Sequence, residues 1–585
     1  MKHIQQVVDK FFSQVNTARN VLILLSICTL AFHPNTFARY GPIKLFILSV
    51  TVTIILIYAK KNFKTSLNKI TLLILIILII SISVNLTISK EDPLLLFFGA
   101  GGRYTGAFAL ISYFLLLYYF SNVNIKNLNT KILIYLTIIG FILSAYGILQ
   151  YLNLDPFDFS TEDKQITLTF GNSNFSSAFL AMCSTANLSL LLFNNYKLKF
   201  RILLFMCYVF VAYTIYYIGD YQGIIILLFS ISGLLLLKLD SITLNKSNLN
   251  KLIKAIPILF ISVSIITFTR GSGPLKSLFE VSSFKDRVEI WLVGIEIFRS
   301  NFLWGIGYDS FISGYPLYRT SRSILNREVD IDSYSAHAHN SVINIAATGG
   351  IFLLLIYLVA VFLVFHHVYR LYRSSSFKDY GLIMVWIAFI LQSMISIDNL
   401  VISSWGFSIA GILISNSLTL ANYAETSELD KQKQIQKAKS QSRTLGLIKN
   451  FSLTAAILGM IILPFNNLMK QTKFANSLKQ VNNVKSQDLL NKNIENLIAS
   501  SSSLVDLEPK VYLTRLLFAN NYIEQAEKLA IAQTISYPSR VLAWDTAAAV
   551  FESQQKFDRA RPFRLKSIQL DPLNFGFKSK LELYK

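Results

Sequence analysis

Long apolar runs are the feature that most constrains this chain. They span about 15 to 25 residues each, the length at which a helix crosses the hydrocarbon core of a bilayer. Apolar residues make up 53% of the 585 residues and charged residues only 15%, which excludes a soluble globular enzyme and a disordered protein. A membrane β-barrel would instead show alternating segments of about ten residues. We therefore expect an all-α polytopic membrane protein, because helices satisfy their backbone polar groups internally.

The runs predict about 12 to 13 transmembrane helices. The expected spans lie near residues 20–34, 42–59, 70–88, 106–121, 131–152, 175–193, 201–218, 222–238, 252–269, 341–367, 380–397, 400–421 and 447–466.

The positive charges behind the net charge of +22 lie mainly in alternate loops, and this pattern indicates the membrane topology. Every second loop is basic, and such loops are retained on the cytoplasmic side of a membrane. These loops contain Lys60, Lys61, Lys64 and Lys69; Lys126 and Lys131; Lys197, Lys199 and Arg201; Lys246 and Lys251; Arg370, Arg373 and Lys378; and Lys431, Lys433, Lys437, Lys439 and Arg443. The N-terminus is therefore expected in the cytoplasm. No basic soluble domain remains for nucleic acid, which we exclude as a partner.

The topology divides the chain into five parts. They are a cytoplasmic segment 1–19, a transmembrane core 20–421 with a large outer loop 270–340, a basic linker 422–446, a last span 447–466 and an outer polar region 467–585.

The polar region shows a 34-residue self-similarity. It relates Pro538 to Pro572 and Ala526 to Ala560, while Trp544, Ala548 and Phe551 occupy first-helix positions of a tetratricopeptide repeat. Two repeats can scarcely bury a core alone, so we expect this region to dock onto the membrane part or onto a protein partner. The alternative is a helical hairpin without a specific ligand.

The outer loops contain nearly all the chemically unusual residues. One is glycine-rich and ends in Arg103, and the next contains Asn172 and Asn174 between Gly171 and the following span. The large loop 270–340 is long enough to be functional or disordered. Near-helical spacing of apolar residues after Arg287 favours an ordered, functional loop.

Arg287 is the first candidate for binding an anion. Residues 283–286 (Ser-Phe-Lys-Asp) resemble a capping box, which would place Arg287 in the first turn of an amphipathic helix on the membrane surface. A cation beside exposed helical N–H groups can hold a phosphate. The alternative is an interfacial helix whose arginine contacts lipid headgroups.

His337 and His339 stand where the large loop enters a span. With Asp330 and Asp332 they could bind a metal. Alternatively, one of them acts as a general base, or they hold the loop by hydrogen bonds. The glycine pair Gly349–Gly350 further along the span is expected to permit close helix packing.

Together these motifs resemble the O-antigen ligase and polymerase superfamily of bacterial envelope proteins. The resemblance covers about residues 70–420. It rests on the glycine-rich segment 99–103, on residues 171–174, on Arg287 followed by Trp291, on residues 305–311 (Gly-Ile-Gly-Tyr-Asp-Ser-Phe), and on residues 339–341 (His-Asn-Ser) through 349–350. It implies a GT-C-like fold, a polyprenyl-diphosphate-linked glycan donor, transfer to an acceptor hydroxyl at the periplasmic face of the inner membrane, and no metal or other cofactor.

Carried over by motif, the family's histidine falls on His339 and its arginine on Arg287. His339 would then deprotonate the acceptor hydroxyl, and Arg287 would neutralise the departing diphosphate. Many members carry a second arginine where this chain has Gln222, which offers hydrogen bonds but no charge. Arg103 is the candidate substitute. His337, Asn340, Asn172 and Asn174 are expected to support these groups, and whether His337 supports or replaces His339 stays open.

The expected function is therefore that of a glycan ligase whose acceptor is the lipid A core. A polymerase that joins repeat units and a protein O-oligosaccharyltransferase are alternatives with the same site. A bicarbonate transporter is a further alternative, but polar groups near the bilayer midplane and inverted repeats, both typical of transporters, are not apparent. A scaffold built around the repeats would not explain Arg287 and His339.

Overall fold

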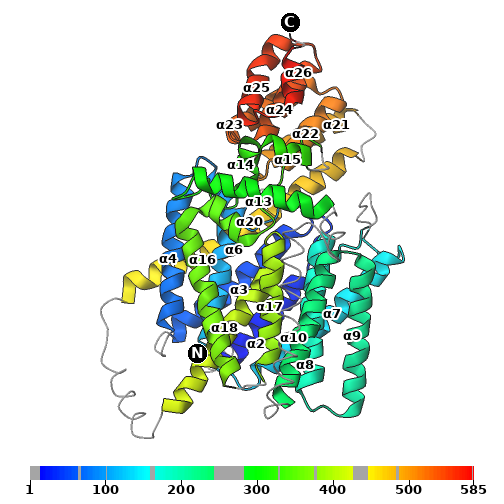
Figure 1. The fold of residues 1–585 in the computed structure, drawn as a ribbon. Helices are drawn as coiled ribbons and strands as arrows, with labels where there is room; N and C mark the ends of the chain where they lie inside the picture. Colours follow the sequence, from blue (N-terminus) through cyan, green and yellow to red (C-terminus); the bar gives the residue numbers. More distant parts are fainter. Residues whose placement is uncertain are drawn as a thin grey trace.

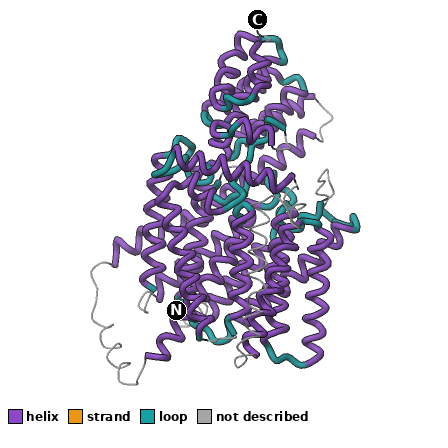
Figure 2. Tube along the Cα trace, in the orientation of Figure 1, coloured by secondary structure: helices purple, strands orange, loops and turns teal. Residues whose placement is uncertain are grey.

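The computed structural model describes residues 13–62, 68–99, 102–157, 165–242, 282–326, 330–374, 378–425, 446–482, 487–582 and 584. This described part is helical and contains no strand (Figure 2). The expected span 252–269 and most of the basic linker lie outside the described residues.

A bundle of long helices forms the membrane part (Figure 1). It consists of α2 (Gln14–Leu30), α3 (Gly41–Asn62), α4 (Lys69–Ile88), α6 (Ala107–Ser121), α7 (Leu128–Tyr151), α8 (Ser173–Phe193), α9 (Leu198–Ile218), α10 (Tyr221–Ile242), α16 (Ser341–Arg373), α17 (Tyr380–Ile395) and α18 (Leu400–Glu425). In the described part, eight helices are long and apolar enough to cross a membrane, namely α3, α4, α7, α8, α9, α10, α16 and α18. The prediction of an all-α polytopic membrane protein is confirmed.

Helices α8 and α18 lie at the centre of this bundle. In their most apolar stretches, 83% and 94% of the residues are buried, compared with 17% in the peripheral α9. The inward positions of α8 are mostly small, which lets neighbouring helices approach closely. Gly223 on α10, for example, lies so close to α8 that a Cβ atom there would stand 2.5 Å from Ser177. The central position of α8 fixes the place of its first residues, which belong to the candidate site.

Short helices cover one end of the bundle, the upper end in Figure 1. They are α5 (Pro93–Phe98), α13 (Ser282–Ser300), α14 (Phe311–Tyr318) and α15 (Ser321–Asn326). The buried face of α13, with Ile290, Val293 and Ile297, packs against residues of α14 and α16. It also packs against residues 330–339, which contain both candidate histidines and which we call the histidine segment. The expected amphipathic helix is therefore present in the large loop.

The start of α13 differs from the expectation. The turn that contains Ser283 is itself helical, because the helix begins at Ser282. Arg287 therefore lies in the second turn and not in the first, away from the exposed N–H groups of the helix start. An anion at Arg287 must be bound by side chains.

The glycine pair of α16 packs in another way than expected. Gly350 breaks the helix with φ 68° and ψ −170°. A Cβ atom there would lie 2.3 Å from the carbonyl oxygen of Leu303. The backbone N–H groups of Ile306 and Gly307 donate to the carbonyls of Ala347 and Thr348 at 3.2 and 3.1 Å. The glycines thus admit the backbone of the large loop, and not a second helix, against α16.

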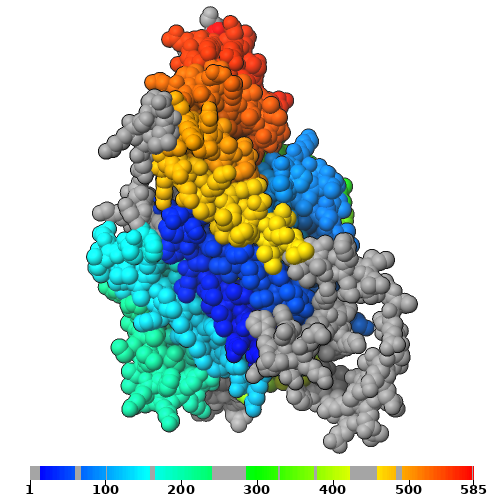
Figure 3. Space-filling model, turned by 180° about the vertical axis from the view of Figure 1, so that it is seen from behind, coloured from blue at the N-terminus to red at the C-terminus, as the bar shows by residue number. Residues whose placement is uncertain are grey.

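The C-terminal region stands on the covered end of the bundle (Figure 1). The long α20 (Gly446–Asn482) leads into it, and we call α21 to α26 the tail. These helices are α21 (Gln487–Ser502), α22 (Glu508–Ala519), α23 (Ile523–Ser536), α24 (Val541–Glu552), α25 (Phe557–Leu570) and α26 (Phe575–Glu582). Seen from behind, α20 passes from the tail down along α3 (Figure 3). The expected boundary between residues 466 and 467 falls inside α20.

The tail consists of successive helical pairs, α22 with α23 and α24 with α25. Ala526 and Ala560, one sequence period apart, are both fully buried on the second helices of these pairs. A small residue at this position lets the paired helices pack closely. The assignment of the pairs to the tetratricopeptide class stays a prediction.

Candidate functional site

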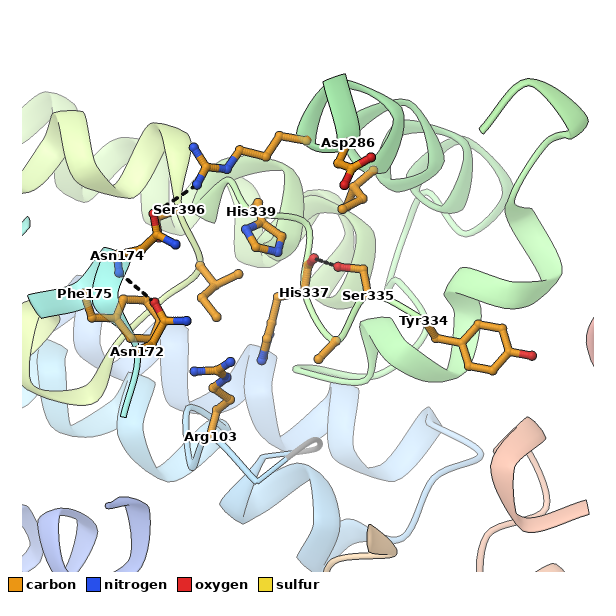
Figure 4. A pocket seen from close by; sticks show the side chains of 14 residues that line it. Arg103, Asn172, Asn174, Phe175, Asp286, Tyr334, Ser335, His337, His339 and Ser396 are labelled. Atoms are coloured by element: carbon orange, nitrogen blue, oxygen red, sulfur yellow. Dashed lines mark hydrogen bonds between the residues drawn. The ribbon is translucent and has the colours of Figure 1, made fainter. Parts of the chain in front are cut away.

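A cavity of about 390 Å³ lies beneath α13 at the covered end of the bundle. Residues from five separate segments of the chain meet there (Figure 4). Its lining consists of Arg103, Asn172, Asn174, Phe175, Asp286, Arg287, Ile290, Tyr334, Ser335, Ala336, His337, His339, Ser396 and Ile397. The structure thus brings together the candidate histidines, arginines and loop asparagines, although more than 230 residues separate Arg103 from His339.

His337 is held by a carboxylate. Its side chain is 2% exposed, and its Nδ1 lies 3.3 Å from Oδ1 of Asp309. The hydroxyl of Thr105 donates to the same carboxylate at 3.2 Å. The buried Nε2 of His337 has no hydrogen-bond partner among the described residues. The imidazole is therefore oriented through one nitrogen, and the other remains available to a molecule in the cavity.

His339 follows at the start of α16. Its backbone has φ 51°, in the left-handed region, and its carbonyl accepts a hydrogen bond from Nε1 of Trp291 at 3.3 Å. Such a conformation persists only where the surrounding contacts enforce it. Asn340 supplies these contacts by capping α16, since its Oδ1 accepts from the N–H of Ile343 at 3.1 Å and its Nδ2 donates to the carbonyl of Met394 at 2.8 Å. The local structure thus fixes where the His339 side chain enters the cavity.

The two arginines of the cavity differ in their partners. Arg287 donates to Oδ1 of Asn174 at 3.4 Å and lies near Asp220. Arg103 stacks on the ring of Phe175, 5.4 Å from its centroid, and has no hydrogen bond or carboxylate partner in the described part of the chain. Burial lowers the pKa of both guanidinium groups, but an arginine remains protonated. The charge of Arg103 is therefore available to an anion.

The asparagines of the second outer loop organise the start of α8. Asn172 caps this helix, because its Oδ1 accepts from the N–H of Asn174 at 3.0 Å. Asn174 in turn faces Arg287 (Figure 4). This side of the cavity is therefore built on the helix at the centre of the bundle.

Gln222, like Asn340, is a candidate that does not line the cavity. It is 3% exposed on α10, and neither end of its amide has a hydrogen-bond partner among the described residues. Two residues earlier, Asp220 lies beside Arg287. Burial raises the pKa of Asp220, while a hydrogen bond from Ser173 and the charge of Arg287 oppose this shift.

The aspartates considered as metal ligands in one alternative lie elsewhere. Asp332 accepts a hydrogen bond from Asn574 of the tail at 2.7 Å, and neither Asp330 nor Asp332 lines the cavity. Within the described ranges, no three His, Cys, Asp or Glu side chains form a cluster that could hold a metal ion. The carboxylate beside the histidines is Asp309.

Sequence reasoning missed two acidic residues near the histidines. Asp309 was visible only as part of the motif 305–311. Asp398 stands in the break between α17 and α18, where it accepts a hydrogen bond from Ser403. Burial raises the pKa of Asp398 to about 6, and the nearby charge of Asp309 adds to this shift. The available signal was a lone aspartate between two apolar spans, which is costly unless it has a role.

The geometry places two histidines and two arginines around one space, and one of these arginines, Arg103, has no carboxylate partner in the described part of the chain. Such a space suits a reaction in which a hydroxyl loses a proton while negative charge develops nearby. Comparison with known families points to the same class of reaction. Residues 166–358 match the O-antigen ligase family. This match supports a transferase of lipid-linked glycans. No curated protein matches the sequence.

The O-antigen ligase segment covers only part of the cavity. It contains both asparagines, Arg287 and the two histidines, together with Asp309. Arg103, Asp398 and the whole tail lie outside the matched residues. The remaining lining is therefore supplied by parts of the chain that the family match does not describe.

Proposed function

We propose that the protein transfers a polyprenyl-diphosphate-linked glycan to an acceptor hydroxyl at the periplasmic face of the bacterial inner membrane. In this proposal the N-terminus is cytoplasmic and the tail is periplasmic. The observation that carries it is the meeting of His337, His339, Arg287 and Arg103 around one cavity, where Arg103 has no carboxylate partner among the described residues. The O-antigen ligase match over residues 166–358 supports the same reaction class.

The proposed step is a direct displacement. The acceptor oxygen attacks the anomeric carbon of the donor sugar, and His339 takes the hydroxyl proton. The bond from that carbon to the diphosphate oxygen breaks, and the diphosphate leaves with the electron pair. Arg103 and Arg287 stabilise the growing negative charge, the role that a metal ion has in other glycan transferases. The step needs no covalent intermediate with the enzyme.

His337 is the second candidate for the base. Its pairing with Asp309 is the arrangement that orients an imidazole for proton transfer, and its Nε2 is unpartnered. We assign the proton transfer to His339 and a supporting role to His337, which holds the acceptor hydroxyl or the diphosphate by a hydrogen bond. The alternative assignment exchanges the two roles.

Single variants separate the two assignments. His339→Ala in purified protein is expected to lower kcat by about 10²- to 10⁴-fold, the contribution of a general base, while His337→Ala and Asp309→Asn lower it less and to similar extents. A larger loss in His337→Ala would exchange the roles. His366→Ala is the matched control, because His366 is an exposed histidine near the opposite end of α16. Full activity of both site variants would overturn the catalytic assignment.

The acceptor is tested in cells. We propose that it is the lipid A core, as for a ligase. In a deletion strain and in a strain with His339→Ala, long chains are then expected to disappear from the core while glycan accumulates on its lipid carrier. A core that carries a single repeat would indicate a polymerase, and an unchanged core with loss of glycoproteins a protein O-oligosaccharyltransferase. An unchanged glycan pool would contradict glycan transfer and favour the transport of a small anion.

A further inference from the structure

The tail binds the histidine segment through a buried aspartate. Asp571, at the end of α25, is fully buried, and Arg319, just after α14, is 3% exposed. Nε of Arg319 donates to Oδ1 of Asp571 at 2.9 Å, and a second guanidinium nitrogen donates to Oδ2. The hydroxyl of Tyr334 donates to the same carboxylate at 2.8 Å. An arginine that binds both oxygens of a carboxylate fixes the relative orientation of the two side chains as well as the distance between them.

These contacts continue into the cavity. Arg319 also donates to the carbonyl of Ile331 at 2.6 Å, so the segment that begins at Asp330 is held on two sides. Tyr334 is the first residue of this segment to line the cavity. Ser335 then donates to the carbonyl of His337 at 2.7 Å. Tyr334, one peptide unit and the hydrogen bond of Ser335 therefore join Asp571 in the tail to His337; Figure 4 draws the last of these contacts.

A second buried aspartate binds the segment that carries Arg103. Asp506, between α21 and α22, accepts from the hydroxyl of Tyr104 at 3.0 Å and from Nε2 of Gln471 at 3.2 Å. Tyr104 follows Arg103 directly, is 1% exposed and has φ 60°. This left-handed conformation directs the tyrosine toward the tail while Arg103 faces the cavity. The tail thus contacts the neighbours of two proposed functional residues.

We propose that the tail completes the active site, and that Asp571 and Asp506 are positioning residues. Asp571 holds the histidine segment, and Asp506 holds Arg103 through Tyr104. This inference rests on the glycan transfer proposed above, because it gives each contact a separate kinetic consequence. A mere docking contact does not require charged groups, since a buried ion pair is often replaceable by apolar residues without loss of stability. What a buried ion pair adds to such a contact is a defined geometry of the groups that it joins.

The kinetic test uses the full-length protein and two isosteric variants. Asp571→Asn displaces the histidine segment and is expected to lower kcat by about 10- to 100-fold, because a misplacement of about 1 Å costs up to that much. The KM for the lipid-linked donor should change less than about twofold. Tyr104→Phe loosens Arg103 and should instead raise the donor KM by about 5- to 20-fold. The reason is that the charged hydrogen-bonding group of Arg103 then contributes less to the binding of the donor.

Asp545→Asn is the matched control. Asp545 pairs with Arg564 inside the tail, 2.6 Å away, and neither residue lines the cavity. Its kinetic constants are expected to equal those of the unmodified protein. Equal loss of kcat in Asp571→Asn and Asp545→Asn, or unchanged kinetics in Asp571→Asn, would overturn the proposal.

A second measurement does not depend on activity. Ser335→Cys, placed in a Cys207→Ser background, creates a buried thiol in the histidine segment, because Ser335 is 7% exposed and the other two cysteines, Cys28 and Cys183, are buried. Addition of Asp571→Asn should speed its alkylation at least fivefold, and addition of Asp545→Asn should not. Equal alkylation rates would contradict the positioning role. Faster alkylation in a protein without transfer activity would overturn the proposed function alone.

Discussion

The two walls of the cavity are held in different ways. One wall, with Asn172, Asn174 and Arg287, stands on α8 and α13 and is supported by the bundle. The other wall comprises residues 102–105 and 330–339, which contain little regular structure. It includes the left-handed residues Tyr104 and His339 and is tied to the tail. We call these the helical wall and the irregular wall.

The difference shows which parts of the site a family match can describe. The O-antigen ligase segment contains all of the helical wall. It also contains residues 330–339 of the irregular wall, but residues 102–105 lie before it, and Asp506 and Asp571, which hold this wall, lie after it. Helix starts are encoded locally, whereas irregular segments need distant partners to hold one conformation. Proposed functional positions therefore lie inside the matched segment, while some of their supports lie outside it.

Substitution of the two arginines of the cavity is expected to have the largest effect, and it tests whether both walls bind the donor. Arg103→Gln and Arg287→Gln are each expected to lower kcat/KM by about 10²- to 10³-fold, as the removal of one charge-stabilising group does elsewhere. The transfer rate from lipid-linked donor is the measurement. Gln222→Ala is the matched control outside the cavity and should cost less than either. Full activity of Arg103→Gln would show that the irregular wall takes no part in donor binding.

Loss of the helix caps compares the walls directly. Asn172→Ala and Asn340→Ala each remove an N-cap and should lower the free energy of unfolding by about 1 kcal/mol. Their effects on kcat should differ, because Asn340 also fixes the backbone of His339, whereas Asn172 acts through Asn174 on Arg287. A thermal melt and a transfer assay on the same samples measure both quantities. If kcat falls equally in both variants, the irregular wall is no more sensitive than the helical one.

A pH dependence of tail docking is the smallest expected effect. Burial raises the pKa of Asp506 to about 7, with the charge of Glu508 adding to the shift, against an ordinary value of about 4 in an unfolded chain. Between these values the folded state binds more protons than the unfolded state, so stability falls as pH rises toward 7 and then levels off. Limited proteolysis of the tail at pH 5.5 and 8 measures this change, and Asp506→Asn should remove it. An increase in stability between these pH values would contradict the assignment.

The sequence predicted the elements better than their supports. Apolar runs located the helices of the bundle, and local motifs pointed to His337, His339, Arg287 and Arg103. The capping-box pattern placed the start of the helix two residues too late, and Arg287 in the first turn instead of the second, because Ser283 is also compatible with a helix interior. Gly349–Gly350 indicated a close approach but not its partner, since a glycine accommodates a loop as well as a helix.

The contacts that hold the irregular wall were beyond local reasoning. Asp309 and His337 are 28 residues apart, and Arg319 and Asp571 are 252 residues apart. No spacing rule links such pairs, because their meeting depends on how the whole bundle and the tail pack. Gln222 shows the converse error. The resemblance aligned Gln222 with an arginine of the family, yet its side chain lies outside the cavity lining.

The separation of 252 residues between Arg319 and Asp571 also has a consequence for newly made chains. A ribosome that adds about 5 to 20 residues per second needs about 13 to 50 seconds to pass from one residue to the other. During that interval the histidine segment has already been synthesised, but its partner in the tail does not yet exist. If the tail completes the active site as proposed, a nascent chain carries the histidine segment without its partner, and glycan transfer can begin only after nearly the whole polypeptide has been made.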